Sequence, residues 1–288
     1  MNDGRGPAAA TAGHFVAARL QARALNKYPG SPPATLDEAY AIQDAAINLW
    51  PDNIAGWKIG LIQPAFREAF AADRIAGPIF QSVTTLAAPN AIIELPLIEN
   101  GFAAVEAEFV ICVGADAPAD RTDWSISDAA ALVEAVHVGI ESAGSPYSRI
   151  NDHGPAVTAS DFGNNAGLVV GPAITNWDGD ALDRFTAEMR INNVSVGRGD
   201  ASMIPGGPIA ALAFVLGVTA RRGRPLRKGQ WISTGAVTGV HQIRIGDTAS
   251  AQFGAGPTLH CRTVRAEPTE TDRDPSRQTA RYQPAKVE

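Results

Sequence analysis

The sequence has little cysteine, no long apolar run and no excess of positive charge. Its two cysteines, Cys112 and Cys261, each fall within a predicted apolar strand, which argues for buried thiols and against a disulfide framework. No apolar run reaches the roughly 18 residues of a membrane-spanning helix, and the first residues lack the charged-then-apolar profile of a signal peptide. The net charge of −6 gives no sign of a nucleic-acid or anionic-membrane surface. We therefore expect a cytoplasmic protein that binds neither nucleic acid nor membrane.

Several catalytic signatures are also missing. The five histidines are scattered without the spacing of zinc ligands. No serine nucleophile elbow is present, and the glycine-rich stretch at 197–208 lacks the spacing of either standard nucleotide-binding fingerprint. Of the histidines, only His153, in the loop Ser148–Pro155, is a candidate acid/base group, and a plain loop histidine is the alternative.

The local patterns divide the chain into three parts. Residues 1–55 read as helical, with one helix over Ala8–Lys27 and a second that opens with a capping box at Thr35–Glu38. Residues 56–265 show short β runs separated by glycine and proline, which predicts a strand-rich α+β body rather than a strict strand–helix alternation. Residues 266–288 are polar with scattered prolines, and we expect a disordered tail there. Helices are expected within the body at Pro64–Ala71, Ser127–Val136 and Pro208–Arg221.

Two glutamates interrupt the longest apolar strand pattern, Phe102–Val113. Residues two apart on a strand point to the same face, so Glu106 and Glu108 project together. If that face is buried, the two carboxylates repel each other and lose hydration, and a divalent cation or a basic side chain should compensate them. A solvent-facing stripe is the alternative interpretation that this spacing leaves open.

A third carboxylate and a lysine add to this pattern. Glu141 closes another short β run, where it can face a site formed by neighbouring strand ends. Three carboxylates completed by water suit Mg²⁺ or Mn²⁺, which prefer oxygen ligands. Lys58 lies between glycines in an apolar strand. It either faces a pocket, where it pairs with a substrate carboxylate or moves a proton, or points outward from a half-exposed strand.

An ordered series of segments covering roughly residues 10 to 265 resembles the 2-keto-4-pentenoate hydratase and 4-oxalocrotonate decarboxylase family of the fumarylacetoacetate hydrolase superfamily. The match is collective and more specific than any single motif. The matching segments are Gly56–Leu61, Val105–Phe109, Gly139–Ser142 with Arg149-Ile150, Asp161 ahead of Gly167–Gly171, Val194–Gly199, Gly206–Pro208, Gly223–Gly229, Thr234–Ala236 and Gly246-Asp247.

The resemblance implies a mixed, β-roll-like, strand-rich body of the fumarylacetoacetate hydrolase type with an N-terminal helical part. It implies a divalent metal, Mg²⁺ or Mn²⁺, at Glu106, Glu108 and Glu141, with Lys58 as the catalytic lysine. It also implies a homo-oligomer that acts on a small 2-oxo or 2-hydroxydienoic acid from aromatic-ring degradation, and it allows a complex with a downstream pathway enzyme.

Further positions are expected to contact substrate, and some depart from the family pattern. The expected substrate-binding residues are Ser82, Arg149, Asp161 and Thr234. Ser82 stands where the family commonly has an acidic residue, and Asp161-Phe162 replaces an Asp-Asn pair, although Asn164 and Asn165 follow closely. These departures are compatible with the metal chemistry and bear on proton routing and substrate shape.

The expected reaction is the addition of water to a 2-hydroxy-2,4-dienoate, similar to 2-keto-4-pentenoate, to give a 4-hydroxy-2-oxo acid. The alternative enzyme is a 4-oxalocrotonate-type decarboxylase, which should carry an extra basic contact, such as Arg149 or Arg198, for a second substrate carboxylate. A non-catalytic accessory subunit of the family is another alternative. Hydration and decarboxylation share a metal-stabilised dienolate step, so the metal ligands do not distinguish them.

Overall fold

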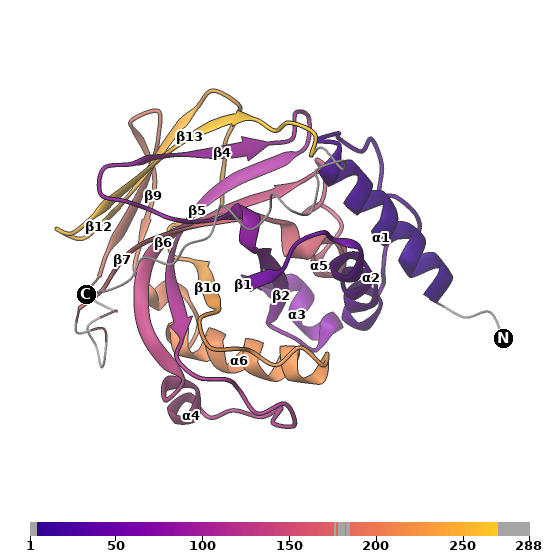
Figure 1. The fold of residues 1–288 in the computed structure, drawn as a ribbon, viewed down its shortest axis with the longest axis horizontal. Helices are drawn as coiled ribbons and strands as arrows, with labels where there is room; N and C mark the ends of the chain where they lie inside the picture. The colour runs from indigo at the N-terminus through magenta and orange to yellow at the C-terminus, as the bar shows by residue number, and fades with distance from the viewer. Residues whose placement is uncertain (1–4, 176, 178–181, 183–184, 270–288) are drawn as a thin grey trace, which may run out of the picture.

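The computed structural model describes residues 5–175, 177, 182 and 185–269. The tail predicted at 266–288 falls outside the described residues from position 270 onward. No helix in the described part of the chain is long and apolar enough to cross a membrane. The predicted α+β architecture is present, with a helical N-terminal part ahead of a strand-rich body (Figure 1).

Two helices, α1 (Arg5–Leu20) and α2 (Leu36–Leu49), form the N-terminal part. The capping box before α2 is confirmed: Thr35 Oγ1 accepts from the Glu38 N–H at 3.2 Å, and Glu38 Oε2 accepts from the Ala34 N–H at 2.7 Å. The first helix is shorter than predicted. The chain leaves α1 because Leu25 forms a parallel bridge with Tyr147, a long-range pairing that helix-forming composition does not reveal.

The larger sheet has eight strands and carries the functional residues described below. Its strand order is β2-β1-β10-β5-β6-β7-β3, with β11 pairing with β5. The strands are β1 (Ile54–Leu61), β2 (Arg74–Phe80), β3 (Thr84–Leu86), β5 (Phe102–Val113), β6 (Val133–Ser145), β7 (Asn165–Ala173), β10 (Trp231–Ala236) and β11 (His241–Gln242).

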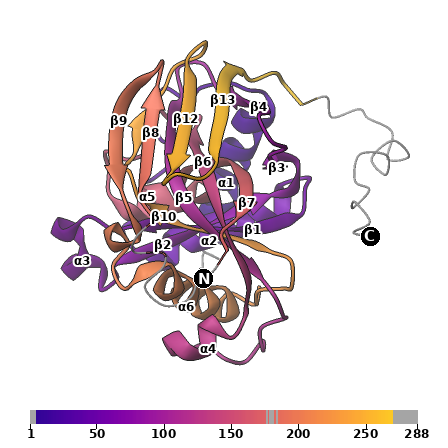
Figure 2. The ribbon, with the colours of Figure 1, turned by 90° about the vertical axis from the view of Figure 1, so that its left-hand side faces the viewer.

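The smaller sheet has five strands in the order β4-β13-β12-β8-β9. Figures 1 and 2 place it at one end of the molecule, with α6 (Gly207–Arg221) and α4 (Ile126–Ala130) at the other. Phe109 of β5 and Phe253 of β12 join the two sheets in one core, with ring centroids 6.2 Å apart. The small-sheet strands are β4 (Ile92–Leu97), β8 (Ala187–Ile191), β9 (Val194–Gly199), β12 (Thr248–Phe253) and β13 (Thr258–Arg265).

Short helices and turns complete the body, and one helix prediction is wrong. Of the region 127–136, only the first few residues are helical, because Val133 to Val136 already pair with β5 as the start of β6. Tertiary pairing with the long strand overrides local helix propensity there. The remaining short elements are α3 (Pro64–Phe70), α5 (Pro155–Ser160), and the 3₁₀ turns η1 (Gln81–Val83), η2 (Phe162–Asn164) and η4 (Ala201–Met203).

Candidate metal centre

Three buried glutamates meet where β5 and β6 pair. Glu106 lies directly opposite Glu141 in the antiparallel register, and Glu108 follows on the same face of β5. Their exposed fractions are 5%, 0% and 0% for Glu106, Glu108 and Glu141. One carboxylate oxygen from each lies within 4.8 Å of the others. The solvent-facing alternative for the two β5 glutamates is therefore wrong.

Hydrogen bonds from the neighbouring strand reach only one of the two carboxylate oxygens of Glu108. The Ser233 hydroxyl donates to Glu108 Oε2, and the Gly235 N–H donates to the same oxygen at 2.9 Å. Among the described residues, nothing donates a hydrogen bond to Glu108 Oε1, although it is buried. Both donors come from β10, the strand next to β5, so the sheet itself orients this carboxylate.

Glu141 shows the same division of its two oxygens. Asn165 Nδ2 donates to Glu141 Oε1 at 2.9 Å. Glu141 Oε2 accepts no hydrogen bond from the described residues and lies 3.4 Å from Lys58 Nζ. Neighbours that fix one carboxylate oxygen and leave the other open are typical of metal ligands.

A divalent cation fits this donor set. Buried oxygens without partners are costly, and a cation between the three carboxylates would satisfy them. The donors are hard carboxylate oxygens, which suit Mg²⁺, Mn²⁺ or Ca²⁺ and contain no thiolate or imidazole. We conclude that the three glutamates fit a divalent metal site.

Lys58 completes the cluster from β1. Its side chain is buried, and Nζ donates to Asn164 Oδ1 at 3.3 Å in addition to facing Glu141. The inward orientation is thus the one adopted, while the catalytic role stays a prediction. Burial lowers the pKa of Lys58, but the combined charges of the three glutamates outweigh it and raise that pKa overall.

Close packing of β2 against η2 brings Asn164 to Lys58. Gly77 of β2 pairs with Lys58, and a Cβ at Gly77 would lie 2.0 Å from the Phe162 carbonyl oxygen, so only glycine allows this approach. Phe162, Gly163 and Asn164 all have positive φ, at 54°, 61° and 57°. Such a run is strained, and here it presents the Asn164 amide to the buried lysine.

Burial and mutual repulsion shift the carboxylate pKa values upward. Burial, followed by the charge of Glu141, raises the pKa of Glu106 to about 7, although Lys58 opposes the shift. The same causes, with Glu106 adding to the repulsion, raise the pKa of Glu108 well above its usual range. Without a metal, the cluster therefore takes up protons that a bound cation would displace.

We expect metal binding to stabilise the protein more at pH 8 than at pH 6. In the metal-free protein, stability contributed by the neutral Glu106 carboxyl is lost as pH rises from the unfolded pKa near 4.5 through the folded value of about 7. A cation offsets that loss at pH 8, whereas at pH 6 it must first displace protons. Thermal melts with and without Mg²⁺ at both pH values measure the difference. An equal or larger metal-induced rise in Tm at pH 6 would contradict it.

A cavity of about 240 Å³ opens onto this cluster. Lys58, Glu106 and Asn164 lie at its buried end, and Leu61, Phe66 and Val240 are its more exposed apolar members. The other lining residues are Ile59, Gly60, Ile62, Gln63, Ile75, Asn151, Gly154, Pro155, Thr158 and Ala236.

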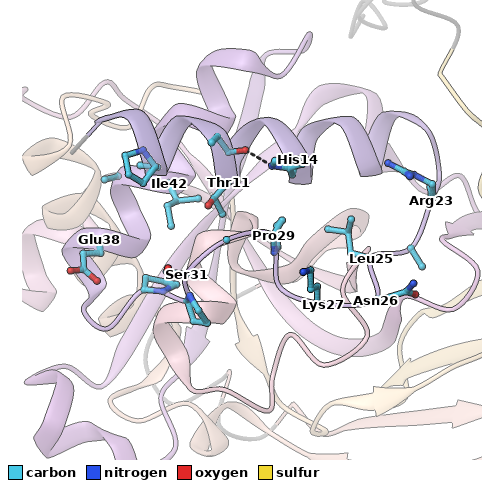
Figure 3. Close-up of a pocket in the computed structure, with 18 residues that line it drawn as sticks. Thr11, His14, Arg23, Leu25, Asn26, Lys27, Pro29, Ser31, Glu38 and Ile42 are labelled. Atoms are coloured by element: carbon cyan, nitrogen blue, oxygen red, sulfur yellow. Dashed lines mark hydrogen bonds between the residues drawn. The ribbon is translucent and has the colours of Figure 1, made fainter. Parts of the chain in front are cut away.

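A larger cavity, of about 1030 Å³, lies elsewhere, among α1, α2 and the segment that joins them (Figure 3). Thr11, His14, Pro29 and Ile42 are among its lining residues, and His14 Nδ1 donates to the Ala10 carbonyl at 2.7 Å. None of the predicted metal or catalytic residues lines it in the described part of the chain. The ionisable residues that line the larger cavity (His14, Arg23, Lys27 and Glu38) are exposed, whereas Lys58 and Glu106 of the smaller cavity are buried and belong to the carboxylate cluster. We therefore assign the chemistry to the smaller cavity.

Two of the predicted substrate-binding residues lie away from the small cavity. Ser82 is exposed on η1, and its N–H donates to Asp52 Oδ2 at 2.7 Å. Arg149 is exposed and pairs with Asp152 at 2.9 Å. Sequence order placed them near the motifs, but their side chains do not line the cavity.

The other two, Asp161 and Thr234, are buried but already bonded. Arg19 Nε donates to Asp161 Oδ1 at 2.7 Å, and Ser145 Oγ donates to Asp161 Oδ2 at 2.6 Å. Thr234 Oγ1 donates to the Phe109 carbonyl at 2.8 Å. Neither side chain lines the cavity, so the geometry gives Asp161 the task of tying α1 to the body.

We expect Asp161→Asn to lower the free energy of unfolding by about 2 kcal/mol, because it leaves the partly buried Arg19 guanidinium without its counter-charge. Metal affinity should not change. Chemical denaturation and metal titration measure the two quantities. Asp152→Asn, which breaks an exposed pair, is the control and should change neither appreciably. A variant that loses metal affinity but keeps its stability would contradict the anchoring role.

Sequence reasoning missed the residues that orient the carboxylates. Ser233 and Gly235 flank the predicted Thr234. The pairing of β10 with β5 shifts register between Ser233 and Ala236, and within this irregularity the Gly235 N–H donates to Glu108, which the motif alone does not show. Asn164 and Asn165 were noted only as neighbours of Asp161. The sequence held a signal for Asn164. It adopts a positive φ of 57°, and asparagine is among the residues that most readily accept such a conformation.

Comparison with known proteins agrees with the resemblance that the sequence motifs indicate. No family model matches the chain. Two curated relatives, 2-keto-4-pentenoate hydratase 1 and 2 of Dechloromonas aromatica (strain RCB), are each 26% identical over 222 residues, covering 74% of this chain and 80% of the relative. These matches confirm the resemblance that the motifs indicate.

Solved structures show the fold. The 4-oxalocrotonate decarboxylase from Pseudomonas putida G7, complexed with magnesium and adipate, superposes with a TM-score of 0.73 at 21% identity and covers 90% of this chain and 98% of its own. The fumarylpyruvate hydrolase from Pseudomonas aeruginosa, in complex with Mn²⁺ and pyruvate, gives 0.55 at 17% identity, covering 73% and 89%. The predicted fold of the fumarylacetoacetate hydrolase type is confirmed.

Proposed function

We propose that this protein is a divalent-metal-dependent hydratase that adds water to a 2-hydroxy-2,4-dienoate and gives a 4-hydroxy-2-oxo acid, in the breakdown of aromatic compounds. The observation that carries the proposal is the cluster of three buried carboxylates with Lys58 at the inner end of a cavity. The curated relatives named as hydratases support the choice of reaction.

Glu106, Glu108 and Glu141 would hold Mg²⁺ or Mn²⁺. The bound cation would supply Lewis-acid stabilisation for negative charge on the C2 oxygen of the substrate. Lys58 balances the substrate carboxylate, and its contact with Asn164 fixes where the ammonium points. The dienol loses its C2 hydroxyl proton and takes a proton at C5 as it becomes the ketone. Water then divides between two carbons, its hydroxyl group going to C4 and a proton to C3. Lys58 Nζ, which lines the cavity, is positioned to assist these proton transfers.

A 2-oxo acid decarboxylase of the 4-oxalocrotonate type is the second candidate. The structural likeness to a decarboxylase that is complexed with adipate, a diacid, favours it. A decarboxylase of this type needs a contact for the second carboxylate. Of the two arginines suggested for that contact, Arg149 pairs with Asp152, Arg198 pairs with Glu188, and neither lines the cavity.

The test is turnover by the purified chain. After treatment with a chelator, activity on a 2-hydroxy-2,4-dienoate should vanish, and it should return with Mg²⁺ or Mn²⁺. Following loss of the dienoate, formation of the 4-hydroxy-2-oxo acid and release of CO₂ separates hydration from decarboxylation. Full activity after chelation would contradict the metal requirement, and absence of turnover by the metal-loaded protein would favour an accessory subunit. Sedimentation of the same sample tests the expected homo-oligomer.

A further inference from the structure

We propose that the outer half of the small cavity is a subsite for an uncharged, apolar substrate tail, with Phe66 and Val240 as the residues that select it. The enzyme would thus prefer a dienoate with one carboxylate over a dienoate with two. The inference rests on the proposed function, because that function places the substrate's carboxylate head at Lys58. The term tail subsite is used below for Leu61, Ile62, Phe66, Ile75 and Val240.

The charges of the cavity are concentrated at one end. Lys58 and Glu106 are the two charged residues among its described lining residues, and their exposed fractions are only 4% and 5%. Glu106 belongs to the carboxylate cluster, and Lys58 faces Glu141. Both charges therefore serve the head of the substrate. The rest of the lining is apolar or neutral.

The tail subsite leaves apolar side chains exposed at the mouth. Leu61, Phe66 and Val240 are 39%, 37% and 55% exposed. The Phe66 ring packs edge-on against the Phe70 ring, with ring centroids 6.4 Å apart. An apolar tail that covers these side chains removes their surface from water, which favours binding.

Gly60 keeps the passage between the two halves open. It shares a strand face with Lys58 and Ile62, because alternate residues of β1 point the same way. A Cβ at Gly60 would lie 3.7 Å from Lys58 Nζ and 3.2 Å from Ile75 Cγ1. Its φ is not positive, so what glycine supplies here is space between the ammonium and the tail subsite.

The arginines that are close in sequence to lining residues of the cavity are not placed to bind a second substrate carboxylate. Arg67, next to Phe66 on α3, donates its Nε to the Ile62 carbonyl at 2.8 Å and is not a lining residue. Arg149 pairs with Asp152 outside the cavity. The polar residues near the mouth, Gln63, Asn151 and Thr158, are neutral. A carboxylate placed against Phe66 and Val240 would lose hydration without gaining a cationic partner, so the subsite discriminates against diacids.

Binding of two saturated 2-oxo acids to the Mg²⁺-loaded full chain tests this directly. The probes are 2-oxohexanoate and 2-oxohexanedioate, which have the same carbon chain and differ in whether C6 is a methyl group or a carboxylate. We expect the monoacid to bind at least about 100-fold more tightly by calorimetry. The corresponding 2-hydroxydienoates should show the same order in kcat/KM.

A lysine at the mouth should reverse the discrimination. Val240→Lys is expected to tighten 2-oxohexanedioate binding by about 10-fold and to weaken 2-oxohexanoate binding, since it adds a cation and removes apolar surface. Val194→Lys is the matched control, because Val194 is 65% exposed on β9 and does not line the cavity. It should leave both affinities unchanged.

The outcomes separate this inference from the proposed function. Equal or tighter binding of the diacid to the unaltered protein, together with metal-dependent turnover, would overturn the tail subsite and leave metal-dependent dienoate chemistry standing. A Val240→Lys variant with unaltered affinity for both probes would overturn the role of that residue. Binding of neither probe and turnover of neither dienoate by the metal-loaded protein would refute the proposed function and the inference with it.

Discussion

Glu108→Gln is expected to weaken divalent-metal binding by at least about 100-fold and to lower kcat by at least about 1000-fold. The substitution keeps the shape of the side chain, and its amide oxygen can still accept from Ser233 and Gly235. It removes the negative charge, and it replaces with an amide nitrogen the oxygen Oε1, which accepts no hydrogen bond from the described residues and which a cation would use. Calorimetric titration with Mg²⁺ and Mn²⁺, and turnover at saturating metal, measure the two effects.

The same variant should make the metal-free protein more stable at pH 8, by more than about 1 kcal/mol. Burial and repulsion hold the pKa of Glu108 far above its unfolded value, so the wild type loses stability as pH rises above about 4.5, and glutamine does not. The difference should disappear near pH 4. Glu99→Gln, at an exposed pair with Arg265, is the control and should leave metal affinity unchanged. A variant that keeps wild-type metal affinity would show that Glu108 is not a ligand.

Lys58→Met is expected to lower kcat by at least about 100-fold while metal binding persists or becomes tighter. Methionine fills the space of the lysine stem without its charge, so the ammonium that faces Glu141 at 3.4 Å no longer competes with the metal. The metal-free variant should be less stable than wild type, because three buried carboxylates then lack their cation. Steady-state kinetics at saturating metal, metal titration and thermal melts separate these effects.

Lys228→Met provides the control for charge removal, since Lys228 is exposed outside the cavity. It should leave kcat and metal affinity as they are. Unchanged turnover in Lys58→Met would refute a catalytic role for this lysine, and loss of metal binding would mean that it supports the carboxylate cluster instead.

Features that depend on neighbouring residues were predicted correctly from the sequence, whereas features that depend on distant segments were not. The capping box at Thr35 was readable because its partners are three residues apart. The helix expected over Ser127–Val136 was mostly wrong because its second half pairs with β5, about 20 residues earlier in the chain. Asp161 was assigned to substrate from its place in a motif, yet its carboxylate is used by Arg19, 142 residues away. Nothing in the local pattern around either residue reports that pairing.

The sequence by itself determined that Glu106 and Glu108 share one strand face, since a strand repeats every two residues, and the ordered motifs indicated the family resemblance. Only the tertiary structure decided that Glu141 lies opposite Glu106, that all three carboxylates are buried, and that Lys58 closes the cluster. Only the folded chain likewise placed Ser82 and Arg149 outside the cavity. The physical reason is that side-chain alternation is set by local backbone geometry, whereas strand neighbours, register and burial are set by packing between segments far apart in the chain.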